Sequence, residues 1–397
     1  MKRPCIAIDV SKGKSCYQCW INEEEKLTNP KFIEHSSIGF EEILEATKKL
    51  EKETNEKPIV VFESTGVYHK TLQCYLQIHN IDFIILSPLA SAKVRKSNIR
   101  STKTDKKDCK NIAKAYFMKN FKLYENSDEI YDKLLDYGRY YQYLTNQLRK
   151  IKIQFRLLLD INFPNFDKLY SNMYTEYPLT LLKKYNHPFK IKNKKPETIA
   201  KYLESNTSHT YTQCLKEAQL IINYCKSTVP GCLESSINCE LLSSVVEQID
   251  NKIKEQKECE RKMISLAKEV YYYGLLVTIP GISDNLASRI IGEIRDINRF
   301  DNANSLVAYT GIDPSIYQSG DKDGLHLKIT KKGNKNLRCL LYLAVRNTLL
   351  RDNKITDYYK KKIAAPYHMN REAAKIACMN KLVRIIYSMC KTGCIFQ

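Results

Sequence analysis

Short apolar runs alternate with amphipathic stretches over roughly the first third of the chain. The apolar runs predict five strands, at residues 4–10, 15–21, 31–34, 58–62 and 82–86. Apolar positions at helical spacing predict three helices, at residues 39–53, 67–79 and 104–120, and Thr104 is suited to cap the last of them. This order predicts an α/β domain over residues 1–125 that begins with an antiparallel meander.

Two later stretches carry apolar heptad seams. The first consists of Ile130, Leu134, Tyr137, Tyr141, Leu144, Leu148, Ile151, Phe155 and Leu158. The second consists of Leu242, Val246, Ile249, Ile253, Met263, Ala267 and Val270, and polar Gln256 and Glu260 interrupt it. Such seams predict long helices that pair within one chain or dimerise two chains, and the sequence does not decide between these. We interpret residues 126–272 as a coiled-coil and helical linker.

The third region, residues 273–397, opens with a turn of the apolar-Pro-Gly-apolar type at Ile279-Pro280-Gly281-Ile282. This turn between two predicted helices resembles the helix-hairpin-helix module, which offers backbone N–H groups to DNA phosphates without reading bases. An ordinary turn between packed helices explains the motif equally well. The basic stretch from Lys328 to Arg338 favours the DNA-binding interpretation.

Charge is concentrated in particular segments of the chain. The 64 Lys and Arg residues exceed the 44 Asp and Glu residues by 20. Residues 93–124 hold 11 basic and 2 acidic side chains and residues 319–351 hold 8 and 2, whereas residues 1–92 hold 11 and 13. Concentrated positive charge predicts a polyanionic partner, in most such proteins a nucleic acid, although solvated lysine-rich surfaces are the simpler alternative.

The start of the chain and the apolar runs exclude some classes of protein. The first ten residues lack the apolar core of a signal peptide, and no apolar run approaches the length of a membrane span. We therefore expect a cytosolic protein without a membrane partner, with its 14 cysteines reduced. Cys16 and Cys19 form a Cys-x-x-Cys pair of the kind found in zinc sites. They fall in a predicted strand, where residues three apart point to opposite faces, so we do not expect them to bind zinc.

Four carboxylates occupy positions suited to metal chemistry. Asp9 and Glu63 follow predicted buried strands, and Asp105 and Asp108 are spaced to share one helix face in a basic segment. Each has a simpler explanation taken alone, as a turn residue, a helix-dipole partner or one half of a surface ion pair. If the four converge, their repulsion requires cations. Two Mg²⁺ ions about 4 Å apart, the arrangement of phosphodiester-cleaving sites, would provide them.

These residues also lie in stretches that match a known family. The chain resembles transposases of the insertion-sequence one-ten family, relatives of the pilin-gene invertase. The matching stretches are IAIDVSK (6–12), FESTGVYH (62–69), KTDKKDCKNIA (103–113), LLLDINFPNF (157–166), IPGISDNLASRIIGEIRDINRF from Ile279, LVAYTGIDPSIYQSG (306–320), ITKKGNKNLRCLLYLA (329–344) and the tail from Tyr367 to Tyr387. The resemblance departs at Cys109, where the family has Ala, and in basic runs that contain Lys where the family favours Arg.

The resemblance implies a fold and a chemistry. It implies a resolvase-like, ribonuclease-H-like N-terminal domain, a coiled-coil linker and a mainly helical C-terminal transposase domain. It implies that Asp9, Glu63, Asp105 and Asp108 bind Mg²⁺ and that Ser319, in the segment 317–320, is the nucleophile, with Ser315 as the nearby competitor. Donor and target DNA, a guiding bridge RNA and a dimer or tetramer are the implied partners. Phosphate contacts are expected from Lys328, Lys331, Lys332, Lys335 and Arg338, which as an alternative form a solvated helix face.

Two other functions remain open at this point. A junction-type nuclease would use the same acids with water as nucleophile and would form no covalent adduct with DNA. A non-catalytic nucleic-acid-binding descendant of a transposase would use only the basic segments. The four acids at the matching positions argue against the second alternative.

Overall fold

A computed structural model of the chain describes residues 2–64, 66–86, 105–118, 121, 123–124, 129–314, 318–319, 322–323 and 329–396. The chain divides into two compact units, Met1–Asp128 and Glu129–Gln397, and each is described by itself. The first unit corresponds closely to the predicted α/β region. The predicted linker and C-terminal region share the second unit, and their division at residue 272 stays a prediction.

The first unit is a mixed five-stranded sheet with helices on both faces. The strands are β1 (Cys5–Val10), β2 (Lys14–Trp20), β3 (Lys31–Glu34), β4 (Ile59–Glu63) and β5 (Phe83–Leu86), in the order β3-β2-β1-β4-β5. Strands β1, β2 and β3 form the antiparallel meander, whereas β1, β4 and β5 are parallel. All five strands fall within one residue of their predicted positions, because β-branched and aromatic runs with turns between them are a strong local signal.

Alternation along the strands divides the core of this unit in two. Helices α1 (Ser37–Thr54) and α2 (His69–Ile78) cover one face, where Ile8 and Phe62 are buried. Helix α4 (Asp105–Met118) covers the other face, where Ala7 and Val61 are buried with Ile112 and Tyr116 of the helix. Odd-numbered positions of β1 and β4 therefore face α4.

Two long helices form the axis of the second unit. Helices α5 (Glu129–Asn162) and α9 (Ile237–Ala267) pack against each other within the chain, so the structure shows the first of the two arrangements that the seams allowed. Leu144, Leu148, Phe155 and Leu158 of the predicted first seam are buried. At the polar break in the second seam, Gln256 Nε2 donates a hydrogen bond of 2.8 Å to Thr145 Oγ1. The break is therefore a position of polar pairing between the helices.

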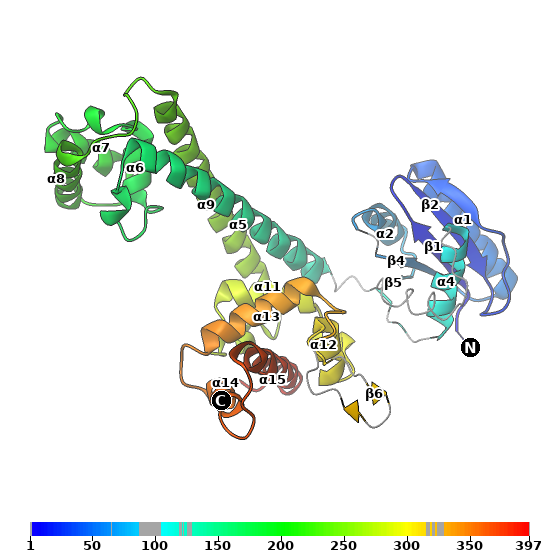
Figure 1. The fold of residues 1–397 in the computed structure, drawn as a ribbon. Helices are drawn as coiled ribbons and strands as arrows, with labels where there is room; N and C mark the ends of the chain where they lie inside the picture. The colour runs from blue at the N-terminus through cyan, green and yellow to red at the C-terminus, as the bar shows by residue number, and fades with distance from the viewer. Residues whose placement is uncertain are drawn as a thin grey trace. The chain divides into compact units, whose positions relative to one another are not determined.

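A small helical group lies at one end of this pair, as Figure 1 shows. It contains η2 (Phe166–Lys168), α6 (Glu176–Lys184), η3 (Pro188–Lys190), α7 (Pro196–Asn206) and α8 (Tyr211–Ser227). The sequence pattern of this region predicted only an unspecified helical link. Its helices are short and separated by Pro, Asn and Lys residues, so no apolar period extends far enough to stand out.

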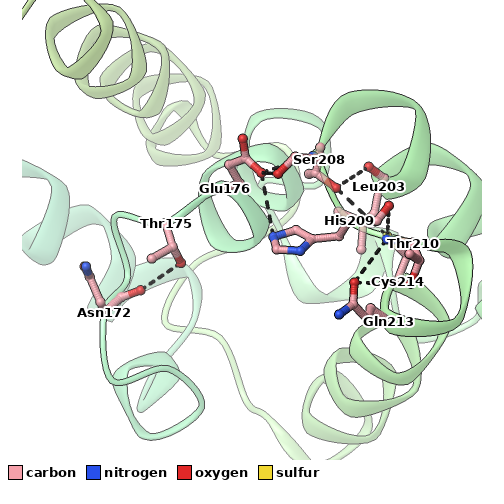
Figure 2. Close-up of polar contacts among 10 residues, drawn as sticks. Asn172, Thr175, Glu176, Leu203, Ser208, His209, Thr210, Gln213 and Cys214 are labelled. Atoms are coloured by element: carbon pink, nitrogen blue, oxygen red, sulfur yellow. Dashed lines mark hydrogen bonds and ion pairs between the residues drawn. The ribbon is translucent and has the colours of Figure 1, made fainter. Parts of the chain in front are cut away.

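Polar contacts fix the α7–α8 loop to the start of α6 (Figure 2). Glu176 accepts hydrogen bonds from Ser208 through its backbone N–H (3.1 Å) and its hydroxyl (2.7 Å), and His209 Nε2 lies 3.6 Å from the same oxygen. The Ser208 bonds lower the pKa of the Glu176 carboxyl. Thr210 and Gln213 form a capping box at the start of α8. These contacts hold three helices in a defined arrangement.

The other end of the helix pair carries a second core. It is built on α10 (Tyr273–Val277), α11 (Asp284–Ile294), η4 (Ile297–Arg299), α12 (Ala303–Thr310), α13 (Lys335–Thr348), α14 (Lys354–Ile363) and α15 (Arg371–Thr392), with a short hairpin of β6 (Gln318–Ser319) and β7 (Lys322–Asp323). Leu134 of α5 and Met263 of α9 are buried in this core. Within the described part of the chain, no helix is both long and apolar enough to cross a membrane.

Candidate active site

Asp9 and Glu63 lie on neighbouring parallel strands at equivalent positions. Strands β1 and β4 pair with Ala7 opposite Val61 and Ile8 opposite Phe62, and continuing this register places Asp9 beside Glu63. Both acids are odd-numbered, so both fall on the face that α4 covers. Each lies at or near the carboxyl end of its strand, where binding sites of α/β sheets form. The predicted pair of acids therefore shares one edge of one sheet face.

Helix α4 brings Asp108 to the same part of the sheet. The helix packs against β1, β2 and β4. Cys109, the residue after Asp108, donates a hydrogen bond of 3.0 Å from its thiol to the backbone oxygen of Cys16, which is the register partner of Asp9. A hydrogen bond with Cys16 and burial raise the pKa of the Cys109 thiol. The start of α4 is therefore anchored at the strand position of Asp9.

Asp108 is oriented by a polar neighbour that the sequence patterns did not single out. Asp108 is buried, with 9% of its surface exposed. Asn111, also buried, donates a hydrogen bond of 3.4 Å from Nδ2 to Asp108 Oδ1. The signal in the sequence was a polar residue at i+3 from the acid, next to the apolar Ile112 and Ala113 of the same helix.

The fourth acid, Asp105, is the first residue of α4, and its side chain is not among those that the structure describes. Within the described residues, no three His, Cys, Asp or Glu side chains form a group able to hold a metal ion. The chemistry of the donors nevertheless suits Mg²⁺, because Asp9, Glu63 and Asp108 offer only carboxylate oxygens on one side of one sheet. The residues present therefore fit a divalent ion in donor type, although the three described side chains do not form a metal-binding group in this arrangement.

The predicted nucleophile belongs to the second unit. Ser319 ends β6 and pairs with Lys322 of β7, so it lies in a hairpin; the description does not extend to its side chain. Ser315 and Lys328 lie outside the described residues. The serine's role stays a prediction, and so does its approach to the acids.

The predicted phosphate contacts divide into two kinds. Lys331, Lys332 and Lys335 are exposed on the segment that leads into α13. Arg338 is half-buried, and its guanidinium donates a hydrogen bond of 2.8 Å to the backbone oxygen of Thr310 at the end of α12. The three lysines are available to a ligand, whereas Arg338 already joins two helices.

The Pro-Gly turn packs inside the helical core. Gly281 has a φ of +88°, and a Cβ built there would lie 2.6 Å from the backbone nitrogen of Thr348. Thr348 donates from Oγ1 to the oxygen of Pro280 (2.7 Å), and Asn347 donates from Nδ2 to the oxygen of Gly281 (3.3 Å). The glycine is thus required by the close approach of α13, which agrees with a packed turn between helices.

Known proteins match both ends of this chain. Residues 6–164 match the model of the DEDD transposase family named for IS110, described as "Transposase", and residues 273–360 match "Transposase IS116/IS110/IS902 family". The transposase for insertion sequence element IS1328 of Yersinia enterocolitica is 26% identical over 163 residues, 40% of this chain and 43% of that protein. The transposase for IS1111A of Coxiella burnetii is 28% identical over 152 residues, 38% and 41%. The matches span less than half the length of these curated relatives.

Proposed function

We propose that this chain, which belongs to the IS110 family of transposases, cuts and rejoins DNA at a carboxylate site in its N-terminal domain. The observation that carries the proposal is the register of β1 and β4, which sets Asp9 beside Glu63 on the face against which α4 and Asp108 pack. A transposase match at each end of the chain supports DNA as the substrate.

The proposed fold of the first unit is ribonuclease-H-like. An antiparallel meander followed by two parallel strands, with helices on both faces, supports it. Asp9, Glu63 and Asp108, with Asp105, would hold divalent metal, for which we propose two Mg²⁺ ions. When bound, such ions supply charge neutralisation at the scissile phosphate and at the leaving oxygen. The carboxylates position that charge, and the Asn111 bond to Asp108 restrains one of them.

Ser319 is our proposed nucleophile. Its oxygen would form a bond to the scissile phosphorus as the P–O bond to the DNA leaving oxygen breaks. The serine proton is lost and the leaving oxygen gains one, so a phosphodiester is exchanged for a phosphodiester and no external energy source is needed. Attack by a new DNA hydroxyl would release the serine and join the strands. Family membership supports this assignment, which does not depend on any contact of the serine side chain.

The partners follow from the same proposal. Donor and target DNA would be held mainly through their phosphates, and the exposed Lys331, Lys332 and Lys335, with Lys328, support this. A bridge RNA would choose the sites by base pairing, so the protein would read backbone shape more than sequence. A dimer or tetramer would let several strands be cut together.

The proposal is tested by an excision assay with donor DNA, Mg²⁺ and the element's own RNA. Asp9→Asn and Ser319→Ala should each abolish strand cutting, whereas Glu34→Gln, at the exposed end of β3, should not. Full activity of Asp9→Asn would refute the active-site assignment. If Ser319→Ala still cuts and no protein is trapped on DNA, the enzyme is a hydrolytic nuclease. If the wild type binds DNA without cutting it, the chain is a non-catalytic binding protein.

A further inference from the structure

The middle of α5 carries positive charge that its own sequence does not balance. Residues 137–159 contain five cations, Arg139, Arg149, Lys150, Lys152 and Arg156, and no Asp or Glu. The facing helix α9 differs, because its cations form ion pairs within the helix, such as Lys252 with Glu255 (2.6 Å) and Arg261 with Glu258 (2.7 Å). The two helices therefore present surfaces of different character.

Three of these cations line one cavity on the helix pair. The cavity has a volume of about 470 Å³, and its walls include Arg149, Lys152, Arg156, Tyr174 and Gln256. The cations follow each other at i, i+3 and i+7, so they share one side of α5 and span about 10 Å along it. Lys150 does not line the cavity.

A partly buried tyrosine, Tyr174, lies beside two of the cations. The Tyr174 ring packs 5.7 Å from the ring of the fully buried Phe155, and its backbone N–H donates to Asn172 Oδ1 (3.0 Å). Tyr174 lies in sequence between Asn172 and Thr175, and Figure 2 shows the Thr175 hydroxyl bonded to the backbone oxygen of Asn172. Lys152 Nζ lies 3.9 Å from the centre of the Tyr174 ring.

Arg156 is held by the same tyrosine. A hydrogen bond with the Tyr174 side chain raises the pKa of the Arg156 guanidinium. Lys152 and Arg156 therefore both lie beside Tyr174, whose ring packs on Phe155.

No carboxylate neutralises this group at close range. Within the described part of the chain, Arg149, Lys152 and Arg156 form no ion pair, and the α9 residue in the cavity wall is the neutral Gln256. Asp160 and Asp167 influence Arg156 only as weaker, more distant charges. Burial lowers the pKa of the Lys152 ammonium, which indicates that this cation is partly removed from water without a compensating acid. Arg149 and Arg156 are exposed, and three neighbouring cations without an acid attract an anion to this part of the surface.

We propose that this cavity binds consecutive phosphates of a nucleic-acid backbone, and that the long helix pair is thereby part of the nucleic-acid-binding surface. The inference rests on the proposed function, which makes a nucleic acid the substrate. Guanidinium groups at two of the three positions suit bidentate contacts with phosphate oxygens. The cavity offers three cations and the Tyr174 hydroxyl to the sugar-phosphate backbone of the nucleic acid. It therefore contributes affinity without sequence preference.

The test uses the full-length protein and the double variant Arg149→Gln/Arg156→Gln. Its matched control is Lys150→Gln, which removes one charge from the same helix outside the cavity. Fluorescence anisotropy gives Kd as a function of salt for duplex DNA, single-stranded DNA and single-stranded RNA, with polyglutamate as an acidic-peptide competitor. Loss of each phosphate contact should lower the slope of log K against log salt by about 0.9 on duplex DNA or about 0.7 on single strands. For the nucleic acid that the cavity holds, the slope measured with the double variant should therefore fall by close to twice this amount.

The three nucleic acids show which of them supplies the phosphates, and the variants show whether the cavity assignment or the proposed function is wrong. The nucleic acid whose slope falls is the one bound. Arg156→Lys keeps the charge but not the guanidinium fork, so it should preserve the slope while raising Kd through loss of the bidentate contact. The inference is overturned if the double variant and Lys150→Gln have the same slopes, or if polyglutamate competes through Arg149 and Arg156 while nucleic acid does not. In the first case the excision assay of the wild type still decides the proposed function independently. A reduced slope together with full cutting by Asp9→Asn would refute the proposed active site and leave the cavity assignment standing.

Discussion

Asp9 and Glu63 lie one register step beyond the paired Ile8 and Phe62, on adjacent parallel strands and on the same face of the sheet. Neighbouring strands are about 4.8 Å apart, so two carboxylates in this relationship repel each other when both are ionised. In the proposed site, bound cations would offset this repulsion.

The first prediction concerns stability without and with divalent ions. In EDTA, Asp9→Asn should be as stable as the wild type or more stable by about 0.2–1 kcal/mol, because a like-charge contact across the strands is removed. Mg²⁺ should raise the Tm of the wild type and have a much smaller effect on Asp9→Asn, because binding to the folded state alone is stabilising. Urea unfolding and thermal melts measure both effects. An equal rise in Tm for both proteins would argue that the ion binds elsewhere.

The second prediction separates the two serines of the segment before β7. Ser319→Ala should remove the covalent protein–DNA adduct on denaturing gels, and Ser315→Ala should leave it in place. Peptide mapping of the adduct from the wild type identifies the linked residue directly. An adduct that survives in Ser319→Ala and disappears in Ser315→Ala would transfer the role to the second serine.

The third prediction distinguishes Arg338 from the lysines around it. Arg338→Ala loses a charged hydrogen bond to the end of α12 and should lower the free energy of unfolding by about 1.5 kcal/mol or more. Lys332→Ala and Lys335→Ala are exposed and should change stability by less than about 0.5 kcal/mol while weakening DNA binding. Chemical denaturation and binding titrations test the contrast. Equal stability of all three variants would contradict the structural role of Arg338.

The fourth prediction follows from a close approach of two backbone segments. A Cβ at Gly333 would lie 2.5 Å from the backbone oxygen of Tyr309, so Gly333→Ala should destabilise the C-terminal core by about 1–3 kcal/mol. Gly274 in α10 has no atom within 4 Å of such a Cβ, and Gly274→Ala should be neutral or slightly stabilising. Thermal melts of the two variants give the comparison. If both lose stability equally, the difference in local packing is not the cause.

Much of the N-terminal fold could be predicted from the sequence. The strands around Asp9 and Glu63 are short apolar runs that only a sheet can bury, and the spacing of Asp105 and Asp108 marks one side of a helix. The side of the sheet could not be predicted, because it depends on the β1–β4 register, which is a long-range pairing. The Cys109–Cys16 contact that anchors α4 is long-range for the same reason.

The second unit was harder to predict for physical reasons. The heptad seams indicated α5 and α9, but both intrachain and interchain pairing bury such seams equally well. The sequence predicted Arg338 as a phosphate ligand because it lies in a basic stretch, and a sequence shows the charge of a side chain but not its hydrogen-bond partner. The internal hydrogen bond of Arg338 becomes visible only once α12 packs against α13. The cationic cavity on α5 had a signal in the acid-free run 137–159, which net charge over longer windows conceals.

We propose that Asp9, Glu63, Asp105 and Asp108 together surround one site for divalent ions. The most direct measurement replaces Mg²⁺ with Fe²⁺ and maps the backbone cuts made by locally generated hydroxyl radicals in the presence of ascorbate. Cuts should cluster near residues 9, 63 and 105–108, should be suppressed by excess Mg²⁺ and should be absent in Asp9→Asn. Cuts confined to other segments, or cuts near these residues that persist unchanged in Asp9→Asn, would contradict it.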